Sequence, residues 1–349
     1  MVALDRAGRR AVSRRGSTAA ALLETASQTF RRTRGYARPM QGIALILLAA
    51  VFFASLDSTT RGLSRPGSAL GVPVLLILTA RYSFQALAMA LVLAPRGRAG
   101  FAPAHPKFQW LRGVLLLLTS LCSFFGVSLM PVPEFTAINM LTPLLVTLLS
   151  ATLLGEHVSR LRWALVAGGF AGALIVIRPG SGAFGWVVVL PLAGAVAYAS
   201  FQVLTSRLAA AEDPMTTHFW TGFVGSALLW PLLLAVTAAS GWDENLARVQ
   251  ALPPLAWFGV LMCGVFGTTG HLFLILALGK APTATLMPFV YSQIGFAALI
   301  GWLAFRHLPD DWAWVGMGVI AACGASSAAL NIRRPGASAP TAAVDVAPE

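Results

Sequence analysis

The stretch "AVFFASLDSTTRGL", residues 50–63, aligns without gaps on "AVAYASFQVLTSRL", residues 195–208, and six of the fourteen positions are identical. A second pair repeats the pattern: "LLGEHVSRLRWALVAGG" at residues 153–169 and "AFRHLPDDWAWVGMG" at residues 304–318. Each member has a His-x-x turn, then a helix start containing Trp, then paired glycines. The sequence therefore predicts a chain built from two related halves.

The composition is that of a membrane protein. Hydrophobic residues make up 57% of the 349 and charged residues only 11%, whereas a soluble globular protein has about 25% charged residues. Apolar runs of about 20 residues, the length that crosses roughly 30 Å of hydrocarbon, recur along the chain. We expect ten transmembrane helices, near residues 41–62, 72–94, 109–130, 134–153, 161–178, 183–206, 216–238, 255–278, 284–304 and 312–331. The predicted fold class is an all-α polytopic membrane protein.

Ten spans divide into five and five, so a duplicated unit with an odd number of spans would be inserted upside down the second time. We expect a basic disordered tail at 1–39, a first five-helix repeat at 40–180, a second at 181–334 and a disordered tail at 335–349. Inverted repeats of this kind are a transporter architecture, with the substrate site near the midplane where the halves meet.

Basic residues are distributed as in a membrane protein rather than a nucleic-acid-binding one. Net charge is +12, but nine arginines lie in the first 40 residues. That segment is an arm on anionic lipid, a transit-like segment, or the result of a misplaced start with Met40 as the true first residue. In the short loops, fourteen basic residues fall on the side of the N-terminus and five on the other. The positive-inside rule therefore places both termini in the cytoplasm, with the chain in a bacterial inner membrane.

Several motifs resemble one superfamily. "EFTAINMLTPLLVTLLSATLLGEHVSRLRW" at residues 134–163 and "GHLFLILALGKAPTATLMPFVYSQIGFAALIGWLAF" at residues 270–305 are similar to ten-helix proteins of the drug/metabolite transporter superfamily with two EamA-type repeats. One departure stands out: Phe305-Arg306-His307 occupies the place where the family commonly has a Gly-Glu pair. The resemblance implies a secondary carrier of small solutes.

Two charged residues fall inside predicted spans, Asp57 in the first and Arg81 in the second. A charge near the bilayer centre costs roughly 2.5–3.5 kcal/mol, so such residues usually face a partner or a cavity. We expect the two side chains to approach each other and line the outer part of a central cavity, with Asp57 as the candidate for proton coupling. The alternative for Asp57 is that the first helix ends early and leaves it at the membrane interface.

Further cavity-lining candidates are polar residues that share one helical face within an apolar span. They are Asn139 and Thr142 in the fourth span, Tyr198 and Gln202 in the sixth, and Tyr291 and Ser292 in the ninth. The alternative for these residues is hydrogen bonding between helices, worth about 0.6 kcal/mol per pair.

Enzyme signatures are absent from the sequence: there is no G-x-S-x-G, no H-E-x-x-H and no phosphate-binding Gly-rich loop with Lys. We expect no enzymatic activity, no metal and no cofactor. The main hypothesis is an alternating-access transporter of a small metabolite or amphipathic solute. The alternative is a non-transporting membrane receptor or assembly subunit that docks through its Arg-rich tail. The expected partners are a small-molecule substrate and membrane lipid but no nucleic acid, and a homodimer is left open.

Overall fold

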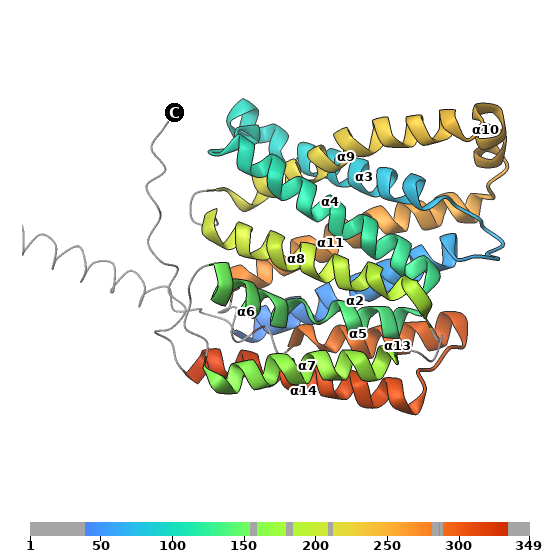
Figure 1. Cartoon of the computed structure of the whole chain (residues 1–349). Helices are drawn as coiled ribbons and strands as arrows, with labels where there is room; N and C mark the ends of the chain where they lie inside the picture. The colour runs from blue at the N-terminus through green and yellow to red at the C-terminus, as the bar shows by residue number, and fades with distance from the viewer. Residues whose placement is uncertain are drawn as a thin grey trace, which may run out of the picture.

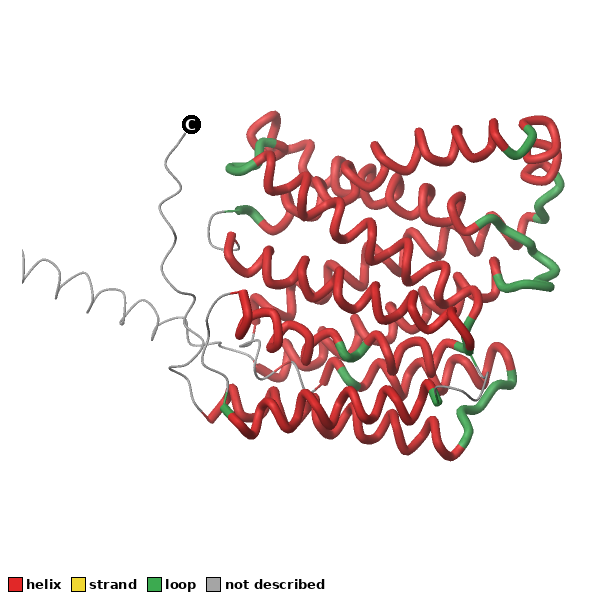
Figure 2. The backbone as a smooth tube through the Cα atoms, in the orientation of Figure 1, coloured by secondary structure: helices red, strands yellow, loops and turns green. Residues whose placement is uncertain are grey.

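A computed structural model describes residues 39–153, 159–178, 184–208, 212–280, 286 and 289–333. Residues 1–38 and 334–349, which hold nearly all of the two predicted tails, lie outside this description, as do residues 154–158. Throughout the described residues the regular structure is helical and no strand occurs (Figure 2). The predicted all-α fold class is confirmed.

Six helices in the described part of the chain are long and apolar enough to cross a bilayer. They are α2 (Pro39–Ser64), α3 (Val74–Leu93), α4 (Pro106–Leu129), α8 (Val189–Leu208), α9 (Pro214–Ala239) and α11 (Pro254–Lys280). Large apolar side chains such as Leu91, Trp230 and Leu261 lie exposed on the outside of the bundle. Contiguous apolar surface of this kind is unfavourable in water and favourable against lipid.

The remaining helices at predicted spans are α5 (Val132–Asn139), α6 (Thr142–Leu153), α7 (Arg160–Ile177), α13 (Ser292–Phe305) and α14 (Asp311–Arg333), of which all but α14 have 18 residues or fewer. The span predicted as one helix at 134–153 is two helices, α5 and α6, separated at Met140 and Leu141. Pro143 has no N–H to donate, and its ring disfavours helical geometry in the residue before it. The hydroxyl of Thr142 donates to the carbonyl of Asn139 at 2.7 Å and satisfies one backbone group that the break frees.

The helix neighbours have the symmetry that a duplication requires (Figure 1). If α2 corresponds to α8, α3 to α9, α4 to α11 and α7 to α14, then each main contact between the two halves should have a mate after exchange. The contact of α2 with α11 is matched by that of α8 with α4, and the contact of α3 with α11 by that of α9 with α4. The exchange maps the pair α3–α9 onto itself and the pair α7–α14 onto itself, and the two helices of each pair are closely packed. The helices therefore form two five-span repeats joined about a pseudo-two-fold axis.

Glycines permit the closest of these contacts, between α7 and α14. A Cβ atom on Gly316 would lie 2.6 Å from the carbonyl oxygen of Gly172 and 3.0 Å from the backbone nitrogen of Val176, both in α7. A Cβ atom on Gly318, two residues further along α14, would meet nothing within 4 Å among the described residues. Close packing of α7 against α14 therefore depends on Gly172 and Gly316 but not on Gly318.

The bundle has two ends. The η1 end carries the 3₁₀ helix η1 (Ala94–Phe101) and the starts of α4 and α9. The α10 end carries α10 (Trp242–Gln250), at the right of Figure 1, and the loops at 65–73 and 306–310. Helix α10 was not predicted, because nine residues with Asp243 and Glu244 among them do not form an apolar run.

Candidate functional site

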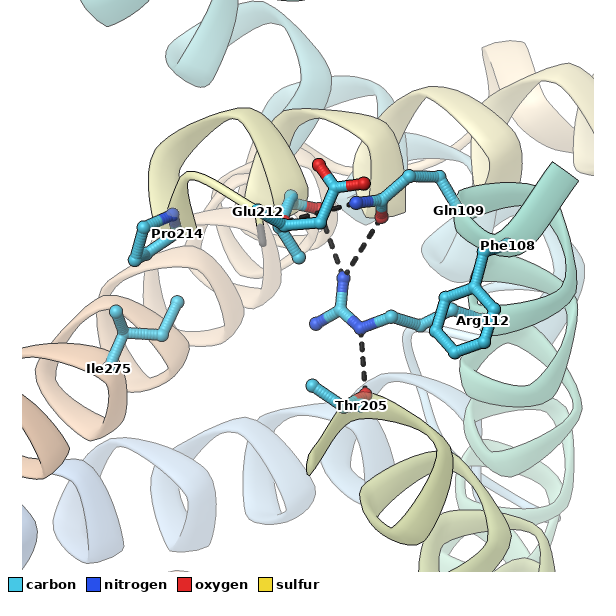
Figure 3. Close-up of a pocket in the computed structure, with 8 residues that line it drawn as sticks. Phe108, Gln109, Arg112, Thr205, Glu212, Pro214 and Ile275 are labelled. Carbon is cyan, nitrogen blue, oxygen red and sulfur yellow. Dashed lines mark hydrogen bonds between the residues drawn. The ribbon is translucent and has the colours of Figure 1, made fainter. Parts of the chain in front are cut away.

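A pocket of about 120 Å³ opens at the η1 end, where helices of the two repeats meet. It is enclosed by α4 of the first repeat and by α8, α9 and α11 of the second (Figure 3). Its lining residues are Phe108, Gln109, Arg112, Thr205, Glu212, Pro214, Thr217 and Ile275. The volume holds several water molecules or a polar group of a solute.

Arg112 is the central polar residue of this pocket, although only 9% of it is exposed. Its Nε atom donates to Thr205 Oγ1 at 2.8 Å, and its Nη1 atom donates to Thr221 Oγ1 and the Thr217 carbonyl, both at 3.3 Å. The guanidinium lies 4.7 Å from the centre of the Phe201 ring. All of these partners are neutral, so the positive charge is hydrogen-bonded without being neutralised.

Glu212 is the acidic residue of the pocket, but it serves the helix connection. Its carboxylate accepts the backbone N–H groups of His105 at 2.8 Å and Ala104 at 3.2 Å. The His105 ring lies 3.5 Å from the same carboxylate. In Figure 3 the Glu212 carboxylate points away from the Arg112 guanidinium. Glu212 therefore ties the segment before α9 to the start of α4.

Arg81 lies further into the bundle, in α3, with only 2% of it exposed. Its Nη1 atom donates to Ser120 Oγ at 3.3 Å, and its guanidinium packs on the rings of Tyr82 at 4.8 Å and Phe124 at 5.6 Å. A Cβ atom on Gly267 would lie 2.5 Å from Arg81 Nε. Glycine at 267 is thus what lets α11 lie against the guanidinium.

Asp57 is 9% exposed, and α2 continues beyond it to Ser64. The alternative in which the first helix ends before Asp57 is therefore wrong. Asp57 and Arg81 interact electrostatically, but among the described residues no ion pair within 4.0 Å joins them. The two charges therefore interact without direct contact, and their lining of a cavity stays a prediction.

Two histidines that are not among the predicted site residues lie in the same interior. The rings of His218 in α9 and His271 in α11 are 6.0 Å apart and inclined by 25°. Gln85 Nε2 donates to the His218 carbonyl at 3.0 Å and lies 3.2 Å from His218 Nδ1. His271 Nδ1 lies 2.9 Å from the Gly267 carbonyl and must carry a proton to bond to it. Gln85 could have indicated this polar interior from the sequence, because it lies one helical turn after Arg81 on the same face.

The other predicted residues fall into two groups. Tyr198 and Gln202 in α8 interact with each other, and the Tyr198 hydroxyl lies in the field of Arg112 and Arg81. Asn139, Thr142, Tyr291 and Ser292 lie with α5, α6 and α13, where Tyr291 packs on Gly324 of α14. Ser292 and Thr142 both donate to carbonyls of their own helix region. The structure therefore brings Tyr198 and Gln202 near the buried arginines and keeps the second group on another side.

At the α10 end, side-chain contacts join the two repeats. His307 Nε2 lies 2.9 Å from Glu134 Oε1, and Glu134 is only 4% exposed. Arg61 of α2 donates to the carbonyls of Val127 and Met130 and lies 5.8 Å from the Phe305 ring of α13. In the described part of the chain, no three metal-ligating side chains come together at this end or elsewhere.

Comparison with known proteins gives the family of this architecture. The model of the EamA-like transporter family matches residues 40–178 and again residues 185–325. The riboflavin transporter of Rhizobium johnstonii is 29% identical over 81% of this chain and 89% of its own length. The S-adenosylmethionine uptake transporter of Rickettsia bellii is 22% identical over 66% of this chain and 75% of its own length. A solved crystal structure with 20% identity covers 84% of this chain and 98% of its own at a TM-score of 0.53, which shows the shared fold.

Proposed function

The chain belongs to the EamA-like transporter family, and on that premise we propose that it moves a small organic solute across the bacterial inner membrane by alternating access. Membership of this family makes it a transporter and an integral membrane protein rather than an enzyme. The proposed substrate pathway runs between the two repeats, from the pocket at the η1 end to the interior around Arg81 and Asp57.

One observation carries the proposal: the two ends of the interface between the repeats differ. The η1 end holds a pocket lined by both repeats, whereas at the α10 end the contacts of Glu134 with His307 and of Arg61 with Phe305 join the repeats. A carrier that opens to one side at a time has this asymmetry, because its binding site must be reachable from one face only. With both termini in the cytoplasm, as the positive-inside rule predicts, the conformation described is the one open to the cytoplasm.

The relatives indicate which solutes to assay first. Proteins 29% and 26% identical to this chain are named riboflavin transporters, and one 22% identical is named for S-adenosylmethionine uptake. Riboflavin fits the amphipathic class expected from the sequence and is the first solute to test.

The test uses the purified full chain in liposomes. Uptake of riboflavin and of S-adenosylmethionine should exceed that of protein-free liposomes and should saturate for the true solute. A metabolite profile of a strain lacking only this gene should show a matching change. Absence of uptake together with an unchanged metabolite profile would rule out transport. A chain that begins at Met40 separates the two hypotheses, because a transporter should keep its uptake without residues 1–39 and a docking protein should lose its function.

A further inference from the structure

We propose that the pocket beside Arg112 binds an anionic group of the transported solute, a carboxylate or a phosphate. This inference rests on the proposed transport function and adds the chemical class of group that the site at the η1 end recognises. It selects among solutes, since a neutral solute would make no use of the charge at this position.

Arg112 carries a buried positive charge. The residue is nine-tenths buried, and a guanidinium stays protonated under all physiological conditions. Removing such a charge from water costs several kcal/mol unless a counter-charge is supplied. Among the described residues no carboxylate lies within 4.0 Å of it. The fold therefore buries a cation whose hydrogen-bond acceptors are all neutral, and Glu212 acts on it only from beyond 4.0 Å.

One terminal nitrogen of Arg112 faces the pocket. Nε and Nη1 are occupied by Thr205, Thr217 and Thr221. In Figure 3 the remaining terminal nitrogen has no hydrogen bond to the residues drawn and faces the space between Thr205 and Ile275. Hydrogen bonds of guanidinium to carboxylate or phosphate are about twice as strong as neutral ones. This donor therefore favours an anionic oxygen over a neutral carbonyl.

Glu212 is the group that could have cancelled this charge, but its carboxylate is engaged elsewhere. It is held by two backbone N–H groups and by the His105 ring, and it points away from the guanidinium. Thr217 supplies a further donor, because its hydroxyl accepts from Gln109 Nε2 at 3.1 Å and keeps its own hydrogen. An anionic group in the pocket would thus meet Arg112 and a hydroxyl, both held in place by packing.

The test compares two solutes that differ by one charged group. Riboflavin is neutral, and flavin mononucleotide is the same molecule with a phosphate added. The variants are Arg112→Gln, which removes the charge, Arg112→Lys, which keeps the charge without the fork, and Arg98→Gln, an exposed arginine of η1 that serves as the matched control. Each is purified, checked for monodispersity in detergent and assayed in liposomes of phosphatidylcholine, which carry no net charge.

The expected result is that the ratio of flavin mononucleotide uptake to riboflavin uptake falls about 10- to 100-fold in Arg112→Gln. Arg112→Lys should lie between that variant and the wild type, and Arg98→Gln should match the wild type. The inference would be overturned if Arg112→Gln left the ratio of flavin mononucleotide uptake to riboflavin uptake unchanged. It would also be overturned if the chain took up riboflavin and flavin mononucleotide did not compete with that uptake. Liposomes that also contain phosphatidylglycerol test the other source of phosphate. If that lipid abolishes the dependence on Arg112, the pocket holds a lipid headgroup and the assignment to the solute is wrong.

If neither flavin is transported, a second measurement tests whether the solute carries an anionic group. The deletion strain is complemented with the wild type, Arg112→Gln or Arg98→Gln, and its metabolites are profiled. Solutes restored by the wild type and Arg98→Gln but not by Arg112→Gln should carry a carboxylate or phosphate. Neutral solutes in that set, or full restoration by Arg112→Gln, would overturn the inference while leaving transport intact. A deletion that changes no solute would instead remove the proposed function, and this inference with it.

Discussion

His307 Nε2 lies 2.9 Å from Glu134 Oε1, so a residue that follows α13 in the second repeat is hydrogen-bonded to a residue of α5 in the first. His307 belongs to the Phe-Arg-His stretch at which this chain departs from the Gly-Glu pattern of the superfamily it resembles. The departure therefore has a structural partner: the histidine bonds to one oxygen of a carboxylate that the other repeat buries at the α10 end.

Removing this partner should destabilise the chain. His307→Ala leaves the Glu134 carboxylate buried with one hydrogen bond fewer, which costs about 1–3 kcal/mol. The variant should melt at a lower temperature in detergent. The double variant Glu134→Gln/His307→Ala should recover part of the loss, because a neutral amide is less costly to bury.

Arg306→Ala is the matched control for this pair, since Arg306 is the exposed neighbour of His307. It should melt close to the wild type. If His307→Ala also melts with the wild type, the contact between α5 and the end of α13 does not hold the repeats together.

Asp310 should make the stability of α14 depend on pH. Its Oδ1 atom accepts the backbone N–H of Ala313 at 2.8 Å, and its Oδ2 atom pairs with Arg178 at 2.6 Å. The backbone hydrogen bond, and then Arg178, lower the pKa of Asp310 below its ordinary value. A carboxyl with a lowered pKa stabilises the fold above its unfolded pKa of about 4, and that stabilisation is lost as the pH falls through the folded pKa.

The measurement is the melting temperature of wild type and Asp310→Ala as a function of pH. The difference should be complete at neutral pH and should vanish well below pH ~4. Asp243→Ala, in the exposed first turn of α10, should show no such difference. A gap between wild type and Asp310→Ala that stays constant down to the lowest pH would show that the charge of Asp310 contributes nothing.

The helical spans and their duplication followed from the sequence because both depend on local composition. An apolar run of about 20 residues can bury its backbone polar groups in lipid only as a helix, whichever neighbours it has. The break between α5 and α6 was missed because the same apolar run continues through Met140 and Leu141. Pro143 disfavours a continuous helix there, and the hydroxyl of Thr142 bonds to the Asn139 carbonyl at the break.

The site was predicted less completely, because it depends on which helices become neighbours. Arg112 stands near the start of an apolar run, where the sequence alone suggested only a cytoplasmic charge. Its burial comes from Thr205 in α8 and Thr221 in α9, residues about a hundred positions away. His218 and His271 were undervalued for the same reason, since their partner Gln85 is in α3. The spacing of polar residues within one helix predicts a polar face, but it does not predict which residues of other helices that face contacts.

Gly316 and Gly318 offer a matched pair for the packing of α7 against α14. Gly316→Ala places a methyl group 2.6 Å from the Gly172 carbonyl oxygen, and backbone atoms cannot move aside as a side chain can. Overpacking of this kind costs about 1–3 kcal/mol. Gly318→Ala meets nothing within 4 Å among the described residues and should be neutral or stabilising by up to roughly 1 kcal/mol, because alanine favours a helix over glycine. Melting temperatures in detergent test the difference, and equal values for the two variants would contradict the close approach of the helices.

We expect Asp57 to couple transport to protons and Arg81 to bind the solute. Both are buried, and they interact without forming an ion pair, so the Asp57 carboxylate is free to take a proton. Asp57→Asn imitates the protonated state permanently and should remove the response of uptake to a proton gradient while exchange of solute continues. Arg81→Gln should lower uptake about tenfold, or roughly 1.4 kcal/mol, with or without a gradient. Ser58→Ala, a buried neighbour in the same helix, should behave as the wild type.

If both single variants transport normally, neither charge belongs to the pathway. If collapsing the proton gradient leaves wild-type uptake unchanged, Asp57 does not couple protons to transport. Its remaining role would then be its electrostatic interaction with Arg81.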